Sequence, residues 1–338
     1  MNRTIVHAEA RRRVPAALGA SALTLFLLAT AAAPVAAAPS LRSRISDGTL
    51  RIFGSPFADQ ITLRQSAVDR NRLEVDLGDD RSADATFDLT GIDAIDVDAA
   101  GGDDTVRIDD VNGAFTATTR TVIEGGNGND TLLGGSGAET FFGGNGDDVV
   151  DGNGGADTAF LGRGADTFVW DPGDASDVVE GQAGTDTMIF NGSGGNETMA
   201  VNAFFGRVSF TRDPGGIVMD LNGVEAIDVR ALVGTDSITV NDASGTDLRL
   251  VNVDLAAALG GTATDGQADT VQVNGTKGDD TIAANANGGA VEVSGLAELV
   301  RITHADPALD HLVIDPVIGT DQVTVDPAVN ALLQVSVL

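Results

Sequence analysis

The chain has 338 residues, with 50 Asp and Glu against 20 Lys and Arg, and its formal net charge is −30. Nucleic acids and anionic membrane surfaces attract positive charge, so this composition excludes both as natural partners. The absence of Cys excludes a disulfide scaffold, thiol catalysis and cysteine-ligated zinc. Because 41 of the acids are Asp and the 43 Gly are turn formers, the acidity belongs to turns rather than helices. We therefore expect an all-β, turn-rich protein.

The first forty residues have the three-part layout of a secretory signal peptide. Basic residues come first, an apolar run from about Val14 to Val35 follows, and small residues end the segment. A cut after Ala37 fits this layout, so we expect a signal peptide over residues 1–37 and a secreted, extracellular mature chain. An uncleaved membrane anchor is the alternative, because the apolar run approaches the roughly 20 residues that span a bilayer. In the mature chain we expect no transmembrane segment.

A nine-residue repeat occupies the middle of the chain. From residue 125 it reads GGNGNDTLL, GGSGAETFF, GGNGDDVVD, GNGGADTAF and LGRGADTFV, and a further copy, GQAGTDTMI, follows at 181–189. The eighth position is apolar in every copy. Five tandem copies in register predict a repeat architecture. The sixth position is always acidic and is occupied by Asp130, Glu139, Asp148, Asp157, Asp166 and Asp186.

The composition of this repeat predicts a turn followed by a short strand. It is a poor helix, since Gly costs about 1 kcal/mol per helical position. Six residues with permissive backbones make a turn, and three make a strand with one side chain inward. Such a strand cannot bury its apolar side alone, so the units must stack, two units to an 18-residue coil. The acids then form two columns, Asp130, Asp148 and Asp166 on one edge and Glu139 and Asp157 on the other.

The spacing of the two columns predicts calcium between successive coils. Neighbouring strands lie about 4.8 Å apart and calcium–oxygen bonds are about 2.3–2.6 Å long, so one ion fits between the carboxylates of adjacent coils. Gly at the first, second and fourth positions lets the backbone turn its carbonyls toward the ion. Magnesium demands a tighter octahedral geometry, and zinc would require His or Cys. A solenoid with solvated acids and no ion is the alternative.

At these residues the chain resembles the RTX, or haemolysin-type, calcium-binding repeat family of secreted bacterial proteins, whose pattern is G-G-x-G-x-D-x-U-x. The resemblance implies a parallel β-roll that holds several calcium ions through sixth-position carboxylates and backbone carbonyls. Glu139 departs from the pattern, because its side chain is one methylene longer. The metal-site residues that the resemblance implies are Asp130, Glu139, Asp148, Asp157, Asp166, Asp186, Gly126, Gly128, Gly135, Gly137, Gly144 and Gly146.

Outside the repeat, short segments in which an Asp precedes alternating apolar residues predict further strands. Their irregular spacing indicates degenerate coils of a longer solenoid or β-meanders. Because these segments lack the full glycine turn, we expect their Asp side chains to be solvated, with calcium binding as the alternative. A short helix is expected from Leu255 to Leu259, and Trp170 is expected to cap the core between solenoid segments. The segments begin at Asp59, Asp104, Asp236, Asp269, Asp280 and Asp321.

The chain thus divides into a signal peptide at 1–37, an N-terminal β-rich segment at 38–122, an RTX-like β-roll at 123–190 and a C-terminal β-rich segment at 191–338. We found no catalytic motif: the zinc-protease pattern His-Glu-x-x-His and the hydrolase pattern Gly-x-Ser-x-Gly are both absent. We therefore expect a non-enzymatic surface, matrix or adhesion protein that rigidifies on binding calcium. A secreted polysaccharide-active enzyme on a β-helix is the alternative, and it would need a cleft lined by carboxylates and Arg. The sequence does not identify a protein or polysaccharide partner.

Overall fold

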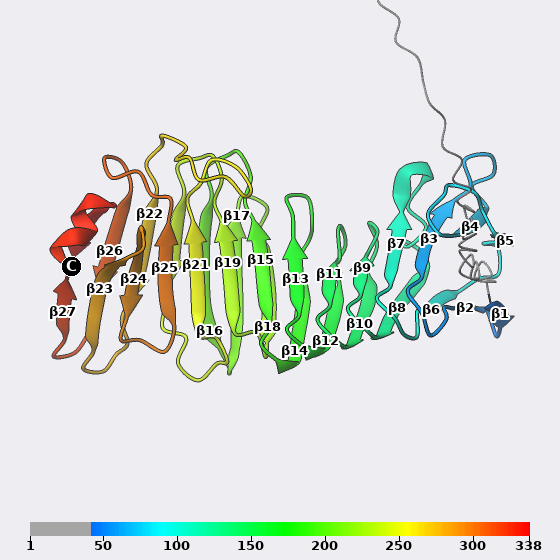
Figure 1. The fold of residues 1–338 in the computed structure, drawn as a ribbon, viewed down its shortest axis with the longest axis horizontal. Helices are drawn as coiled ribbons and strands as arrows, with labels where there is room; N and C mark the ends of the chain where they lie inside the picture. Colours follow the sequence, from blue (N-terminus) through cyan, green and yellow to red (C-terminus); the bar gives the residue numbers. More distant parts are fainter. Residues whose placement is uncertain (1–41) are drawn as a thin grey trace, which may run out of the picture. The chain divides into compact units, whose positions relative to one another are not determined.

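The computed structural model describes residues 42–338, which form a β-solenoid of two facing sheets (Figure 1). The expected all-β solenoid with parallel strands is confirmed. The expected signal peptide at 1–37 lies outside the described residues. Within residues 42–338, neither of the two short helices has the length and apolarity needed to cross a bilayer.

Each of the two sheets, called A and B here, has 14 strands. In spatial order, sheet A contains β1 (Arg42–Ser46), β2 (Thr49–Phe53), β6 (Ala94–Asp98), β8 (Arg120–Asn127), β10 (Glu139–Asn145), β12 (Thr158–Gly164), β14 (Val178–Gly184), β18 (Ile217–Asn222), β17 (Arg207–Asp213), β16 (Thr198–Phe204), β20 (Ser237–Val240), β22 (Thr270–Asn274), β26 (His311–Asp315) and β28 (Gln334–Val337). Sheet B contains β27 (Gln322–Val325), β23 (Thr281–Asn287), β24 (Ala290–Ser294), β25 (Leu299–Thr303), β21 (Leu250–Asp254), β19 (Ala226–Arg230), β15 (Thr187–Asn191), β13 (Thr167–Trp170), β11 (Val149–Asp151), β9 (Thr131–Leu133), β7 (Thr105–Asp109), β3 (Gln60–Gln65), β4 (Arg72–Leu77) and β5 (Ala85–Asp88).

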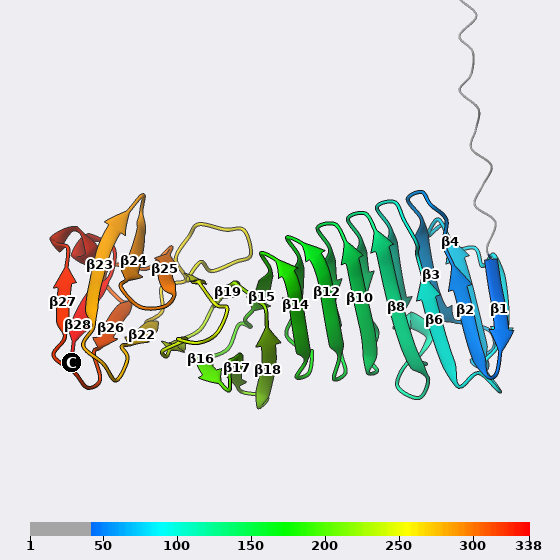
Figure 2. The ribbon, with the colours of Figure 1, turned by 90° about the horizontal axis from the view of Figure 1, so that it is seen from below.

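In the repeat, the chain alternates between the two sheets and advances one coil every 18 residues. Thr140 of β10 pairs with Thr158 of β12 in sheet A, and Val149 of β11 pairs with Thr167 of β13 in sheet B. All of these pairs are parallel, and Figure 2 shows β8, β10, β12 and β14 side by side. The two-unit coil predicted from the repeat is therefore confirmed.

The apolar eighth positions of the repeat fill the space between the sheets. A three-residue strand presents one side chain inward, and stacking places these side chains in continuous rows. Full burial of such a side chain contributes roughly 1.5–3 kcal/mol relative to leaving it in water. Each eighth-position side chain is at most 1% exposed: Leu132, Phe141, Val150, Ala159, Phe168 and Met188.

Three antiparallel meanders interrupt the parallel coils. Strands β3, β4 and β5 form one at the N-terminal end of sheet B, β16, β17 and β18 form one inside sheet A, and β23, β24 and β25 form one inside sheet B. The flanks therefore contain both degenerate coils and meanders. The predicted domain limits at 122/123 and 190/191 fall inside β8 and β15, so the sheets run through them without a break.

Trp170 lies in the interior where the repeat meets the central meander. Its side chain is 0% exposed, its ring is parallel to that of Phe190 with the centroids 4.1 Å apart, and its Nε1 donates to the carbonyl of Ala175 at 2.8 Å. Phe210 of β17 packs on the other side of Phe190, with 4.5 Å between the centroids. The three rings thus continue the core from the repeat into the meander, as the cap expected at Trp170 requires.

The prediction of a short helix from Leu255 to Leu259 is wrong. Leu255 and Ala256 directly follow β21, and their side chains are at most 2% exposed. Ala256 forms an isolated β-bridge with Thr264. Packing of these two side chains into the solenoid interior overrides a weak local helix preference. The helices of the described residues are two 3-10 turns, η1 (Asp110–Asn112) and η2 (Pro327–Ala331).

Candidate metal centre

The sixth-position acids of the first column form a ladder beside sheet B. The Oδ1 of Asp148 accepts a hydrogen bond from the backbone N–H of Asp130 at 2.8 Å, and the Oδ1 of Asp166 accepts from Asp148 at 2.8 Å. The backbone carbonyl of each acid accepts in turn from the residue after the next acid, as Asp130 does from Val149. Asp186 continues this column although it lies outside the tandem copies, since its Oδ1 accepts from Asp166 at 3.0 Å.

The second carboxylate oxygen of these acids is buried and has no hydrogen-bond partner. This holds for the Oδ2 atoms of Asp130, Asp148, Asp166 and Asp186, whose side chains are at most 1% exposed. A buried polar atom without a partner costs about 1–3 kcal/mol, and a buried charge costs more. An oxygen-seeking cation between the coils would remove that cost, so these residues fit a bound calcium ion.

The second column runs beside sheet A and is shorter. The Oδ1 of Asp157 accepts from the backbone of Glu139 at 2.7 Å, and the Oδ1 of Asp177 accepts from Asp157 at 2.9 Å. The Oδ2 of Asp157 and the Oε1 of Glu139 are buried without partners. Sequence reasoning missed Asp177, which lies in the irregular segment between copies. Its signal was an Asp directly before Val178 and Val179, the pattern that precedes the other strands.

The glycines of the turns fall into two groups. Gly126, Gly128, Gly144 and Gly146 have φ between +109° and +127°, a region that L side chains avoid. Their turns stack so closely that a Cβ on Gly144 would collide with the carbonyl of Gly126, and one on Gly146 with that of Gly128. These four positions therefore need Gly both for backbone conformation and for the approach of successive carbonyls.

Gly135 and Gly137 do not have this conformation. In their turn, the backbone N–H of Gly135 donates to Oε2 of Glu139 at 2.8 Å, and that of Gly137 donates to Oγ1 of Thr116 at 3.1 Å. The N–H of Ser136 also points at a carboxylate, Oδ2 of Asp110, at 2.8 Å. Because backbone N–H groups rather than carbonyls meet the carboxylates, the unit at 134–142 has the turn that is least like a cation site.

Burial perturbs the acid–base properties of both columns. Desolvation raises the pKa of Asp148 to about 7, and the charges of Asp130 and Asp166 add to the rise. Burial likewise raises the pKa of Asp157 to about 9, with the charge of Glu139 adding to it. It raises the pKa of Glu139 and of Asp186 to about 7 each, and those of Asp130 and Asp166 as well. These carboxyl groups therefore hold their protons tightly unless a cation compensates their charge.

Among residues 42–338, no Lys or Arg forms an ion pair with the column acids. The same residues contain no cluster of three or more His, Cys, Asp or Glu side chains that could hold a metal ion. An ion between two coils would therefore take one or two carboxylates and complete its shell with backbone carbonyls and water. Calcium accepts such a mixed oxygen shell, at six to eight ligands.

The expectation that the flanking Asp side chains are solvated is wrong. Asp104, Asp236 and Asp269 are at most 2% exposed, Asp59 is 5% exposed and Asp280 is 9% exposed. These side chains are buried because each carboxylate accepts a hydrogen bond from the backbone of its own turn or of the preceding coil. Asp321 is half-buried, and its Oδ1 accepts from the backbone of Asp280 at 2.8 Å.

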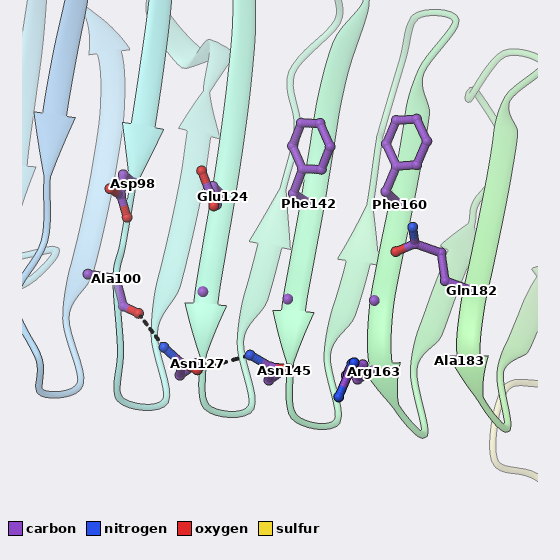
Figure 3. A pocket seen from close by; sticks show the side chains of 13 residues that line it. Asp98, Ala100, Glu124, Asn127, Phe142, Asn145, Phe160, Arg163, Gln182 and Ala183 are labelled. Carbon is purple, nitrogen blue, oxygen red and sulfur yellow. Dashed lines mark hydrogen bonds between the residues drawn. The ribbon is translucent and has the colours of Figure 1, made fainter.

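A groove of about 630 Å³ runs along the outer face of sheet A over the repeat (Figure 3). Its lining includes the parallel ring pair of Phe142 and Phe160, with centroids 5.1 Å apart. Asp98 and Glu124, which occupy paired positions on β6 and β8, lie on one side of the rings, and Arg163 lies near the turns. Sequence reasoning missed this groove. Its signal was Phe at the ninth position of two units 18 residues apart, which places both rings on one outer face.

Comparison with known proteins gives one match. Residues 121–150 and 133–168 match the family model of the RTX calcium-binding nonapeptide repeat (4 copies). No curated protein matches the chain significantly. The matched segment contains the turns from Asp130 to Asp166, whereas Asp186 and the flanking acids lie outside it. The family resemblance found in the repeat is thereby confirmed, and repeats of this type bind calcium.

Proposed function

Since the chain is an RTX-repeat protein, we propose that it is a secreted protein whose β-roll binds several calcium ions and rigidifies on binding them, in a non-enzymatic surface, matrix or adhesion role. The observation that carries this proposal is the row of buried, unpartnered carboxylate oxygens at Asp130, Asp148 and Asp166. Bound calcium compensates their charge and joins each coil to the next. The signal-peptide layout at 1–37 supports secretion, which is typical of RTX-repeat proteins.

The energetics favour a switch between a loose and a rigid state. Extracellular calcium modules have dissociation constants of about 10⁻⁴ to 10⁻³ M. At a free calcium concentration ten times the dissociation constant, each ion stabilises the folded state by roughly 1.4 kcal/mol. Several ions together supply a large share of the 5–15 kcal/mol that typically separates folded from unfolded domains. Export into a calcium-rich medium would thus complete folding.

Calcium titration of the purified protein tests this function. We expect the melting temperature to rise on adding millimolar calcium, by about 2–4 °C for each kcal/mol gained, and to fall again with a chelator. Magnesium at the same concentration serves as the control and should give a smaller rise. A far-UV dichroism spectrum and a melting temperature that ignore both calcium and chelator would overturn the proposal.

The non-enzymatic role competes with a polysaccharide-active enzyme, for which the groove on sheet A is the relevant feature. It offers two carboxylates, Asp98 and Glu124, on neighbouring strands about 4.8 Å apart, together with Arg163 and two aromatic rings. A glycosidase acid usually lies in a desolvated pocket, whereas Glu124 is exposed and the groove is open. The groove therefore supports binding better than hydrolysis. Release of sugars from a polysaccharide by the purified protein would overturn the non-enzymatic proposal.

A further inference from the structure

We infer that calcium sites continue beyond the matched repeat, at the turns that end in Asp104, Asp236 and Asp269. The inference rests on the proposed function, because it extends the same kind of site to new residues. None of the three lies in the segment that matches the RTX model. Asp104 precedes the repeat at β7, whereas Asp236 and Asp269 precede β20 and β22 in the C-terminal half.

Two kinds of turn, called open and closed here, are distinguished by the second carboxylate oxygen of the Asp or Glu that precedes the strand; Glu139 and Glu298 belong to neither kind. In an open turn, one oxygen accepts from the preceding coil and the other is buried without a partner. In a closed turn, the second oxygen accepts from the backbone N–H of the second residue of its own turn. Asp130, Asp148, Asp157, Asp166 and Asp186 of the repeat all lie in open turns.

Several flanking turns are closed. Ser55 donates to Oδ2 of Asp59 at 2.6 Å, Thr276 donates to Oδ2 of Asp280 at 2.7 Å, and Asp306 donates to Oδ2 of Asp310 at 2.6 Å. Glu197 is closed as well, because Ser193 donates to its Oε2 at 3.0 Å and Arg212 pairs with its Oε1. In these turns the protein itself satisfies the carboxylate, and no oxygen is left for a cation.

The turn at 99–104 is open. The Oδ2 of Asp104 has no partner and the side chain is 1% exposed, whereas its backbone N–H donates to Oδ1 of Asp130 at 2.8 Å. Ala100 and Gly102 have φ of +78° and +106°, close to the +109° and +125° of Gly126 and Gly128 in the repeat.

This turn also stacks on the repeat as the repeat turns stack on one another. A Cβ on Gly126 would collide with the carbonyl of Ala100, and a Cβ on Gly128 with that of Gly102. The same relation holds one coil later, between Gly144 and the carbonyl of Gly126. The space between the turns at 99–104 and 125–130 is therefore built like the spaces inside the repeat.

The turns that end in Asp236 and Asp269 form a third column, beside sheet A. The Oδ1 of Asp236 accepts from Glu197 at 2.8 Å, the Oδ1 of Asp269 accepts from Asp236 at 2.8 Å, and the Oδ1 of Asp310 accepts from Asp269 at 2.9 Å. The Oδ2 atoms of Asp236 and Asp269 are buried without partners, and both side chains are at most 2% exposed. The two middle members are thus open, and the two ends are closed.

Charge distinguishes Glu197, at one end of this column, from the two middle members. Arg212 forms an ion pair with Glu197, but no Lys or Arg of residues 42–338 pairs with Asp236 or Asp269. The nearby Asp265 has no unused oxygen, because its Oδ2 accepts from the backbone of Gly234 at 3.0 Å and its Oδ1 from that of Gln267 at 2.8 Å. A hard divalent cation with oxygen ligands, as calcium is, suits two adjacent carboxylates with unused oxygens.

Counting bound calcium in single-residue variants tests this inference. Asp104→Asn and Asp269→Asn each keep an oxygen for the ladder hydrogen bond but replace the unpartnered oxygen by an amide. By equilibrium dialysis at saturating calcium, we expect each variant to lose about one ion relative to the parent protein. The double variant Asp236→Asn/Asp269→Asn should lose no more than Asp269→Asn alone, because one ion lies between the two turns. Asp280→Asn, in a closed turn, is the control and should keep every ion.

Asp148→Asn separates this inference from the proposed function. If Asp148→Asn loses calcium while Asp104→Asn and Asp269→Asn retain all of it, the sites outside the repeat are refuted and the repeat sites stand. If Asp148→Asn also retains all of its calcium, both are refuted.

Stability without calcium gives a second measurement. Because the substitutions remove a buried, uncompensated charge, the calcium-free variants should melt at or above the temperature of the calcium-free parent. A lower melting temperature would show that the carboxylate at that position is structural and would overturn the site there.

Discussion

The acids that precede strands use their two carboxylate oxygens differently. Oδ1 of Asp148 joins two coils by accepting from the backbone of Asp130, whereas its Oδ2 is buried without a partner. The first oxygen stabilises the stack, and the second carries charge that destabilises it in the absence of a cation. On the proposed function, a single residue type thus joins the coils and makes their stability respond to calcium.

This arrangement predicts that pH and calcium act in opposite directions. Burial raises the pKa of Asp148 to about 7 and that of Asp157 to about 9, above the ordinary value near 3.9. At a pH between the ordinary pKa and the raised pKa, the folded state binds more protons than the unfolded state. The free energy of unfolding therefore falls as pH rises through the pKa of the folded state. Calcium-free protein prepared by dialysis should melt about 5 °C or more lower at pH 8.5 than at pH 5.5.

Calcium supplies the control, because it binds only the ionised carboxylates and its affinity therefore increases with pH. In saturating calcium, the decrease in melting temperature between pH 5.5 and 8.5 should shrink or reverse. Thermal denaturation followed by circular dichroism measures both series. A calcium-free protein that becomes more stable with rising pH in this range would contradict the assignment of buried, protonated acids.

The acids also show how far sequence reasoning reaches at the residue scale. The columns could be predicted from the nine-residue spacing, but the class of each flanking turn could not. Asp104 and Asp280 share the local sequence Gly-Asp-Asp-Thr, yet the first turn is open and the second is closed. The difference lies in the second residue of each turn: Ala100 has a positive φ, whereas Thr276 donates its N–H to Asp280. The shared Gly-Asp-Asp-Thr sequence therefore does not determine whether a turn is open or closed; the backbone conformation at the second residue of the turn does.

At the scale of the element, the turns of the first column act as stacked layers. Gly144, at φ +119°, lies against the backbone of Gly126 in the preceding coil. A side chain there would strain its own backbone and push the two turns apart. The ion site depends on that distance, so backbone approach and calcium affinity are coupled.

Gly144→Ala should therefore lower both stability and calcium affinity. We expect about 1–3 kcal/mol from the unfavourable φ, and a further loss from the collision with the carbonyl of Gly126. Gly173→Ala is the matched control: its φ is +127°, but a Cβ there would meet nothing within 4 Å. Urea denaturation in calcium and in chelator measures both variants. Equal losses of stability, with calcium affinity unchanged in Gly144→Ala, would show that the turns do not stack as described.

Strands were easier to predict than their pairing. Alternating apolar residues after Asp236 and Asp269 predicted β20 and β22, and both strands are present. The same alternation in β16, β17 and β18 gave no sign that these strands run antiparallel. The alternation of apolar residues shows which side chains of a strand are buried. It does not show whether the strand runs parallel or antiparallel to its neighbour, because that depends on which sheet edge the strand joins.

Over the whole of residues 42–338, the meanders preserve the two-sheet architecture. The central meander adds strands to sheet A and a later one adds strands to sheet B, so both sheets reach 14 strands and their shared core stays continuous. The repeat lies in the interior of both sheets, with flanking strands on each side (Figure 1). The flanks are therefore joined through the coils of the repeat.

This placement predicts where the protein first opens when calcium is removed. Most of the open turns lie between residues 125 and 190, so their uncompensated charges concentrate local instability there. The cuts that chymotrypsin makes in chelator but not in calcium should lie within this segment, for example after Phe142 or Phe160. Calcium at ten times the dissociation constant should slow these cuts by about tenfold for each ion that opening releases.

The hairpin tip at Phe205 provides an internal control for protease activity. Its side chain is 92% exposed and it lies outside every open turn, so cleavage there needs no opening of the coils. Its rate should be the same with calcium and with chelator. Mass spectrometry of the early fragments identifies both sets of cuts. Calcium-sensitive cuts that lie in the flanks instead of the repeat, or equal calcium protection at Phe205 and in the repeat, would show that calcium does not act through the central coils. The predicted pattern instead requires the ions to hold together the segment on which both flanks depend.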